Sequence, residues 1–192
     1  MMEWIRLTDV ENEYFKGAWE IYEQSFPIYE QRLLSDQEKA MQHEDFHFMA
    51  IVEDNNVIAM IGFWSPKPTE QVSATNGVIN GRKIQYVEHL AVHPSMRGRQ
   101  IGTKVLNQLA EEGKTIILEI DPPVDSISIN RLHFYERVGF KLNDYDHVHP
   151  PYRQGNHGHD LKVLSYGQTI SDETFEAFNH YLKNTVMQFA QK

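Results

Sequence analysis

One stretch of the chain, residues 86–109, constrains the fold more than any other. Its first seven residues, up to Val92, are mostly apolar and predict a buried strand. Pro94 marks the end of that strand, because proline cannot donate to a sheet ladder. From Ile101 onward, apolar residues recur with the 3.6-residue period of a helix that packs one face on a core. The sequence therefore predicts a strand, a turn, a loop and a helix in succession.

The loop between this strand and helix has the composition of an anion-binding site. It carries Arg97 and Arg99 together with Gly98 and Gly102, and it leads directly into a helix N-terminus. Free backbone N–H groups and the positive end of the helix dipole favour an anion at such a position. Glycine permits close backbone approach or a positive φ. The residues alone predict either a phosphate cradle or a surface turn whose arginines are solvated.

The same stretch resembles the acetyl-CoA-binding motif of the GNAT superfamily of N-acetyltransferases. That motif reads Arg/Gln-x-x-Gly-x-Gly/Ala, and residues 97–102 (RGRQIG) match its arginine and its final glycine. Gln100 stands where the motif has its first glycine. A second block, residues 134–140 (FYERVGF), resembles a later helix of the family and the start of the next strand. The resemblance implies an α/β (α+β) fold over about residues 4–166, with a mixed, mostly antiparallel central sheet flanked by helices.

The resemblance also implies which residues hold acetyl-CoA. Backbone groups of residues 90–92 would pair with the pantetheine arm like an added strand, and an N–H there would stabilise the oxyanion. The basic loop would hold the phosphates. The full set of predicted cofactor-binding residues is Leu90, Ala91, Val92, Arg97, Gly98, Arg99, Gln100, Ile101, Gly102 and Thr103.

Two residues are predicted to carry the proton transfers of acetyl transfer to an amine. Glu88 is the predicted general base, and strict alternation would place it on the strand face of Tyr86, Leu90 and Val92. Tyr135 is the predicted general acid, because a phenol can protonate the leaving thiolate. The alternatives are a Glu88 that pairs with a nearby Arg or His, and a Tyr135 that is simply part of the core.

Composition narrows the possible partners. A formal net charge of −9 argues against a nucleic-acid-binding protein and favours cationic small partners. The chain has no cysteine, which excludes disulfides, thiolate metal sites and a cysteine nucleophile, so the amine is expected to attack the thioester directly. The N-terminus lacks an apolar signal segment and no apolar run is long enough to span a bilayer, so we expect a cytoplasmic protein without membrane contact. We expect either a monomer or a homodimer.

The remaining segments predict surface features around this core. Residues 65–81 read as a polar excursion between strands, and residues 147–159 as a loop. The latter contains two His-x-His pairs, which we interpret as loop histidines and not as a metal site, because a metal needs converging ligands. Pro151 to Arg153 in that loop would form a packed turn or contact a substrate.

The C-terminal residues predict an addition to the GNAT-like domain. We assign residues 1–167 to an acetyltransferase domain and residues 168–192 to a helical extension that packs on the same domain. Ser171 would cap this helix. Its apolar stripe consists of Phe175, Phe178, Leu182, Val186 and Phe189.

The sequence thus predicts an N-acetyltransferase that moves an acetyl group from acetyl-CoA to a primary amine of a small molecule or peptide in a ternary complex. The alternative is a non-catalytic acyl-CoA or nucleotide-binding sensor on the same fold, because a fold does not fix a function. The sequence does not identify the acceptor amine.

Overall fold

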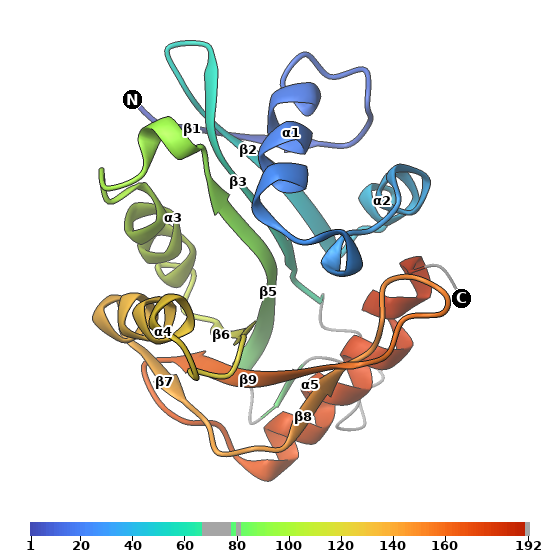
Figure 1. Ribbon diagram of the computed structural model, residues 1–192, viewed down its shortest axis with the longest axis vertical. Coiled ribbons are helices and arrows are strands. Elements are labelled where there is room, and N and C mark those ends of the chain that lie inside the picture. The colour runs from blue at the N-terminus through green and yellow to red at the C-terminus, as the bar shows by residue number, and fades with distance from the viewer. Residues whose placement is uncertain (67–77, 80–81, 191–192) are drawn as a thin grey trace.

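A computed structural model of the chain describes residues 1–66, 78–79 and 82–190, and its centre is one mixed sheet (Figure 1). Neighbouring strands are antiparallel except for β5 and β6, which are parallel. Among the described residues the strands follow the spatial order β1 (Glu3–Leu7), β2 (Phe46–Glu53), β3 (Asn56–Trp64), β5 (Arg82–Val92), β6 (Thr115–Ile120), β9 (His159–Tyr166) and β7 (Phe140–Leu142). Two short strands lie off this path, β4 (Val78–Ile79) beside β5 and β8 (His147–His149) beside β9.

Helices cover both faces of the sheet, so that it has a separate core on each side. Figure 1 shows α3 (Ile101–Ala110) and α4 (Ser126–Val138) on one face. The other face carries α1 (Phe15–Ser25), α2 (Leu34–Met41) and α5 (Asp172–Asn184). Three short 3₁₀ turns complete the described elements: η1 (Ile28–Glu30), η2 (Pro94–Met96) and η3 (Val186–Phe189). The predicted fold class, a mostly antiparallel sheet flanked by helices with a C-terminal helix, is confirmed.

Local sequence chemistry accounts for several boundaries. Asp54 and Asn55 both have positive φ, 50° and 60°, which is the conformation of a tight hairpin turn between β2 and β3. The Asp125 side chain accepts hydrogen bonds from the backbone of the first turn of α4. Gly139 ends that helix with φ of 112°, a value that glycine adopts without strain.

The sequence predicts two segments without regular structure, residues 65–81 and 147–159. The segment predicted as a loop over residues 147–159 begins with β8, whose residues pair with the start of β9, so this part of the prediction is wrong. β8 and β9 are consecutive antiparallel strands, and the Pro- and Gly-containing segment between them gave the whole region the composition of a loop. Most of the predicted polar excursion, residues 67–77 and 80–81, lies outside the described residues.

The sheet opens between β5 and β6. The two strands pair only from Ile84–Thr115 to Val87–Leu118, whereas β5 continues to Val92. On its other edge β5 remains paired with β3 as far as Val92. Beyond Val87, the β6-facing edge of β5 therefore has no strand against it in the described structure, and its backbone groups face the opening. The backbone N–H and C=O groups on this edge of β5 are therefore positioned to hydrogen-bond to an extended ligand in place of a strand.

A β-bulge at Glu88 changes which residues share a face of β5. Gly62 pairs with His89 and Phe63 pairs with Val87, so Glu88 is the additional residue in the ladder. Tyr86 packs in the α1/α5 core, whereas Leu90 and Val92 pack against the α3/α4 core. The prediction that Glu88 shares a face with Leu90 and Val92 is therefore wrong, because alternation holds only in an unbroken ladder.

The C-terminal segment is part of the α1/α5 core. Phe178, Leu182 and Val186 are almost completely buried. The Phe178 ring lies 5.1 Å from the ring of Tyr86 in β5, measured between centroids. No helix in the described part of the chain is both long and apolar enough to cross a membrane.

Candidate active site

A cavity of about 490 Å³ fills the opening between β5 and β6. Its walls include residues 86–92 of β5, residues 118–121 at the end of β6, and Tyr135 of α4. The segment after β8, including His149 and Tyr152, forms another wall. The sequence-predicted catalytic pair and residues 90–92 are thus brought to a single cavity.

A second cavity, of about 500 Å³, lies at the basic loop. Six of the seven loop residues predicted to bind the cofactor line it, together with Phe134 and Arg137 of α4: they are Arg97, Gly98, Gln100, Ile101, Gly102 and Thr103. Arg99 is exposed and lines neither cavity. Val92 and Arg97 line both cavities, which therefore adjoin.

The backbone conformation at Gln100 accounts for the glycine that the family motif has at this position. Gln100 is in the left-handed conformation, with φ of 59°, immediately before α3. This is the position at which the motif has glycine, and glycine alone adopts such a φ without cost. Gly98 also has a positive φ, 78°. Gly102 lies against α4, because a Cβ there would come 3.3 Å from the Phe134 ring.

Glu88 is completely buried and both of its carboxylate oxygens are paired. Oε1 lies 2.7 Å from the Arg32 guanidinium and accepts a 2.7 Å hydrogen bond from the Tyr152 hydroxyl. Oε2 accepts from Trp64 Nε1 at 2.8 Å. Burial alone would raise the pKa of Glu88, but the Arg32 charge and the hydrogen bonds overcome it and lower this pKa to about 2. Glu88 is consequently ionised at neutral pH and is a weak proton acceptor.

Arg32 connects this carboxylate to the C-terminal segment. Its guanidinium lies between 5.4 and 5.8 Å from the ring centroids of Phe46, Trp64 and Tyr152. It also donates to the backbone carbonyls of Val186 and Phe189 at 3.4 and 3.2 Å. Although burial opposes the charged form, Glu88 raises the pKa of Arg32. Nothing in the local sequence around Arg32 indicates this role, since all its partners are distant in the chain.

Tyr135 is both a core residue and part of the cavity wall. Its ring packs edge-on against Phe134 and Phe140, with centroids 5.0 and 5.6 Å away. Burial raises the pKa of Tyr135 to about 12, so the phenol keeps its proton at neutral pH. Tyr135 can therefore be a core residue and still be a candidate proton donor in the cavity.

A second buried carboxylate, Glu119, forms a network that the sequence analysis did not identify. It accepts hydrogen bonds from the Tyr86 hydroxyl and from His147 Nε2, and its Oε2 lies 3.9 Å from His149 Nε2. Burial opposes ionisation, but His149 and the bond from His147 hold the pKa of Glu119 below its usual value. The one available signal was the alternation of His147, Val148 and His149, which places both histidines on the buried face of β8.

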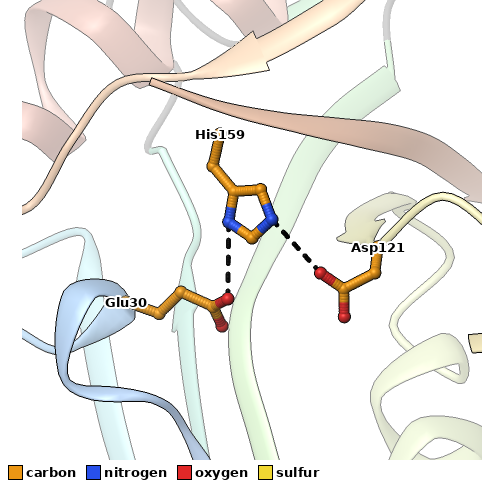
Figure 2. Close-up of side chains that lie close together, drawn as sticks. All are labelled: Glu30, Asp121 and His159. Atoms are coloured by element: carbon orange, nitrogen blue, oxygen red, sulfur yellow. Dashed lines mark ion pairs between the residues drawn. The ribbon is translucent and has the colours of Figure 1, made fainter. Parts of the chain in front are cut away.

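Three partly exposed titratable groups also line this cavity, and Figure 2 shows how they face one another. His159 Nδ1 lies 3.4 Å from Glu30 and its Nε2 lies 3.3 Å from Asp121. Burial and the Asp121 carboxylate raise the pKa of Glu30. These groups are of the type that bind metal ions, with atoms within 4.8 Å of one another. However, the contacts of His159 with Glu30 and Asp121 already hold the three groups together.

The fold combines a mixed sheet that opens between β5 and β6 with a basic loop at the N-terminus of α3, a type of position at which anions bind in α/β proteins. A sequence model described as the acetyltransferase (GNAT) family matches residues 4–140. The chain belongs to this family. A search of curated proteins found no match.

Solved structures agree with this assignment. An acetyltransferase of the GNAT family from Bacteroides thetaiotaomicron is 26% identical, with a TM-score of 0.80, and the match covers 96% of this chain and 98% of that one. The ribosomal-protein-S18-alanine N-acetyltransferase from Escherichia coli is 16% identical, with a TM-score of 0.56 and 90% and 97% of the two chains covered. Arabidopsis thaliana NAA60 in complex with acetyl-CoA is also 16% identical, with a TM-score of 0.57 and 86% and 98% covered. At these identities the last two are similar in fold alone.

Proposed function

We propose that this protein is an N-acetyltransferase that transfers the acetyl group of acetyl-CoA to a primary amine of a small molecule or peptide. The observation that carries the proposal is the junction of the two cavities at Val92 and Arg97. One cavity offers cationic and backbone N–H groups for phosphates, and the other offers titratable groups for chemistry on an amine. A thioester placed between them would bring its reactive carbonyl to the free edge of β5.

Acetyl-CoA would supply the acyl group, and the chain would supply binding and proton transfer. The loop at residues 97–103 would hold the phosphates. The β6-facing backbone edge of residues 90–92, which has no strand against it in the described structure, would bind the pantetheine arm. A backbone N–H of this segment would stabilise the oxyanion. The formal net charge of −9 favours an acceptor that arrives as a cation.

We assign Glu88 a positioning role in this proposal. Its two oxygens are already satisfied, and a pKa of about 2 makes it a poor acceptor for the proton of an ammonium ion whose own pKa is about 10. It holds Arg32 and Tyr152 against the wall of the cavity instead. The prediction that Glu88 is itself the base stays a prediction.

The activity can be tested by incubating the protein with acetyl-CoA and a panel of primary amines while free thiol is measured. Thiol release that depends on one amine, with the N-acetyl product seen by mass spectrometry, would support the transferase. CoA binding without transfer to any amine or peptide would instead favour the acyl-CoA sensor.

Reversing the charge of Arg97 should weaken CoA binding. We expect Arg97→Glu to reduce affinity at least tenfold by calorimetry, because it places a carboxylate where both cavities meet and phosphates would bind. Lys16→Glu on α1 is the matched control, since it makes the same change in net charge at an exposed side chain far from the loop. Equal affinity of Arg97→Glu and the control would contradict the loop assignment.

Removing the phenolic hydroxyl of Tyr135 should slow turnover and spare CoA binding. We expect Tyr135→Phe to lower kcat by roughly 10- to 10,000-fold, the range for a general acid, because the thiolate would lose its proton donor. Tyr166→Phe is the control: its ring also packs on Phe140, at 5.3 Å, but it does not line the cavity. Similar rates for both variants would show that Tyr135 is only a core residue.

A further inference from the structure

We propose that the acceptor ammonium is bound between His149 and Glu119 and that His149 Nε2 takes its proton. This inference rests on the proposed function and names a part of the site that the GNAT resemblance did not supply. It begins from an unpaired ring nitrogen of His149, a residue of the cavity wall. His149 is 4% exposed, and its Nε2 is buried without a hydrogen-bond partner among the described residues.

The tautomer of His149 follows from its other ring nitrogen. Nδ1 lies 2.6 Å from the carbonyl oxygen of Pro150, and a carbonyl only accepts, so Nδ1 carries a proton. In the neutral ring Nε2 is then a bare acceptor. The ring is fixed by this bond and by stacking on Tyr152, with centroids 4.9 Å apart. A buried acceptor without a donor is costly, which indicates a position kept for a ligand.

The group opposite Nε2 is a second acceptor. Glu119 Oε2 lies 3.9 Å away, too far for a direct hydrogen bond. Both residues line the cavity. An ammonium nitrogen can donate to two acceptors at this separation with N···O and N···N distances of about 2.8 Å. The gap therefore suits a primary ammonium, which offers three donors and a positive charge beside an ionised carboxylate.

The other titratable groups of the cavity are less suited to accept the proton. Glu88 is fully paired and has a pKa of about 2. Burial lowers the pKa of His89 to about 4, and its Nε2 faces the carbonyl of Glu30. Glu30 is engaged with His159. His159 also lines the cavity, but both of its ring nitrogens already face carboxylates, Glu30 at 3.4 Å and Asp121 at 3.3 Å. His149 Nε2 faces Glu119 Oε2 at 3.9 Å without a hydrogen bond.

The reaction would then proceed with balanced protons. The ammonium gives one proton to His149 Nε2, and the free amine attacks the thioester carbonyl carbon. The C–S bond breaks, and the thiolate takes a proton from Tyr135. The new N–C bond leaves a second proton on the nitrogen, which returns to Tyr135 through solvent. His149 releases its proton to water, so one proton is released overall for each amide formed.

Binding can be tested without any turnover. The probe is n-butylamine hydrochloride, titrated at neutral pH into the full-length protein saturated with CoA, while the imidazole ¹⁵N resonances are followed. We expect the free protein to show His149 with a protonated Nδ1 and a bare Nε2, and we expect the probe to shift Nε2. Unchanged His149 resonances, or a ring that already carries a proton on Nε2 before the probe is added, would overturn the proposal.

The catalytic part needs the amine that the thiol-release screen finds to be acetylated. His149→Ala should lower kcat by roughly 100- to 10,000-fold, and added imidazole should restore part of the rate by occupying the vacated space. His147→Ala is the matched control, because His147 bonds the same carboxylate yet does not line the cavity. If His147→Ala lowers kcat, added imidazole should not restore the lost rate.

The two levels of the proposal fail in different ways. Wild-type turnover in His149→Ala, or equal rescue of both variants, would overturn the role of His149 while the transferase assignment stands. A shift of His149 Nε2 with n-butylamine, but no acetylation of any amine, would support the ammonium site and overturn the transferase assignment.

Discussion

Deleting residues 168–192 is expected to abolish cooperative folding of the remaining chain. The deletion removes Phe178, Tyr181, Leu182 and Val186, which are between 0% and 9% exposed. Each large apolar side chain contributes roughly 1.5–3 kcal/mol when buried, and a whole domain is stable by only about 5–15 kcal/mol. It also removes the two carbonyls that accept from Arg32. Thermal unfolding followed by circular dichroism should show no sharp transition.

A milder substitution tests the same packing in a chain that still folds. Phe178→Ala should lower the free energy of unfolding by about 3–5 kcal/mol, because it leaves a cavity beside Tyr86. Glu176→Ala, at an exposed position of the same helix, is the control and should change it by less than about 0.5 kcal/mol. If residues 1–167 melt like the full chain and remain monomeric, the extension is independent of the domain.

Replacing Glu88 by glutamine should destabilise the protein by about 3–5 kcal/mol, because it leaves the Arg32 guanidinium buried without its counter-charge. The second variant, Arg32→Met combined with Glu88→Gln, should recover much of this loss since no buried charge remains. Denaturant unfolding of Glu88→Gln, of Arg32→Met and of the double variant gives the coupling energy between Glu88 and Arg32. A Glu88→Gln protein as stable as the wild type would contradict the buried ion pair.

The same variants separate the two roles of Glu88 in catalysis. If Glu88 acts only by compensating the buried Arg32 charge, the double variant should regain activity along with stability. If Glu88 is the base, the double variant should stay as slow as Glu88→Gln, because neither protein has the carboxylate. The rates of the wild type, Glu88→Gln and the double variant are compared at a temperature where all three proteins are folded.

The ion pair also predicts how stability depends on pH. The pKa of Glu88 is about 2 in the folded protein, below its ordinary value of 4.5. A lowered pKa contributes stability above the unfolded pKa, and this contribution is lost as pH falls from about 4.5 to about 2. The loss attributable to Glu88 is roughly 3 kcal/mol. Glu88→Gln should lack this part of the acid sensitivity, whereas an unchanged acid profile would argue against the lowered pKa.

The sequence by itself determined the elements and the family of this protein. Periodic apolar residues from Ile101 onward defined α3. The loop at residues 97–102 carried the family motif. These signals are local, because they depend on propensities, hydrophobic period and backbone freedom within a few residues.

Only the tertiary structure decided the chemistry around Glu88 and Glu119. The bulge that redirects β5 at Glu88 exists in the pairing with β3 and has no signature in the strand's own residues. Arg32, Tyr152 and Trp64 surround that carboxylate from three separate segments of the chain. Which polar groups are buried together is set by long-range packing, and burial in turn sets their charges and proton affinities. Residue types along the chain therefore indicated an acyltransferase, whereas the positions of its proton-transfer groups required the folded molecule.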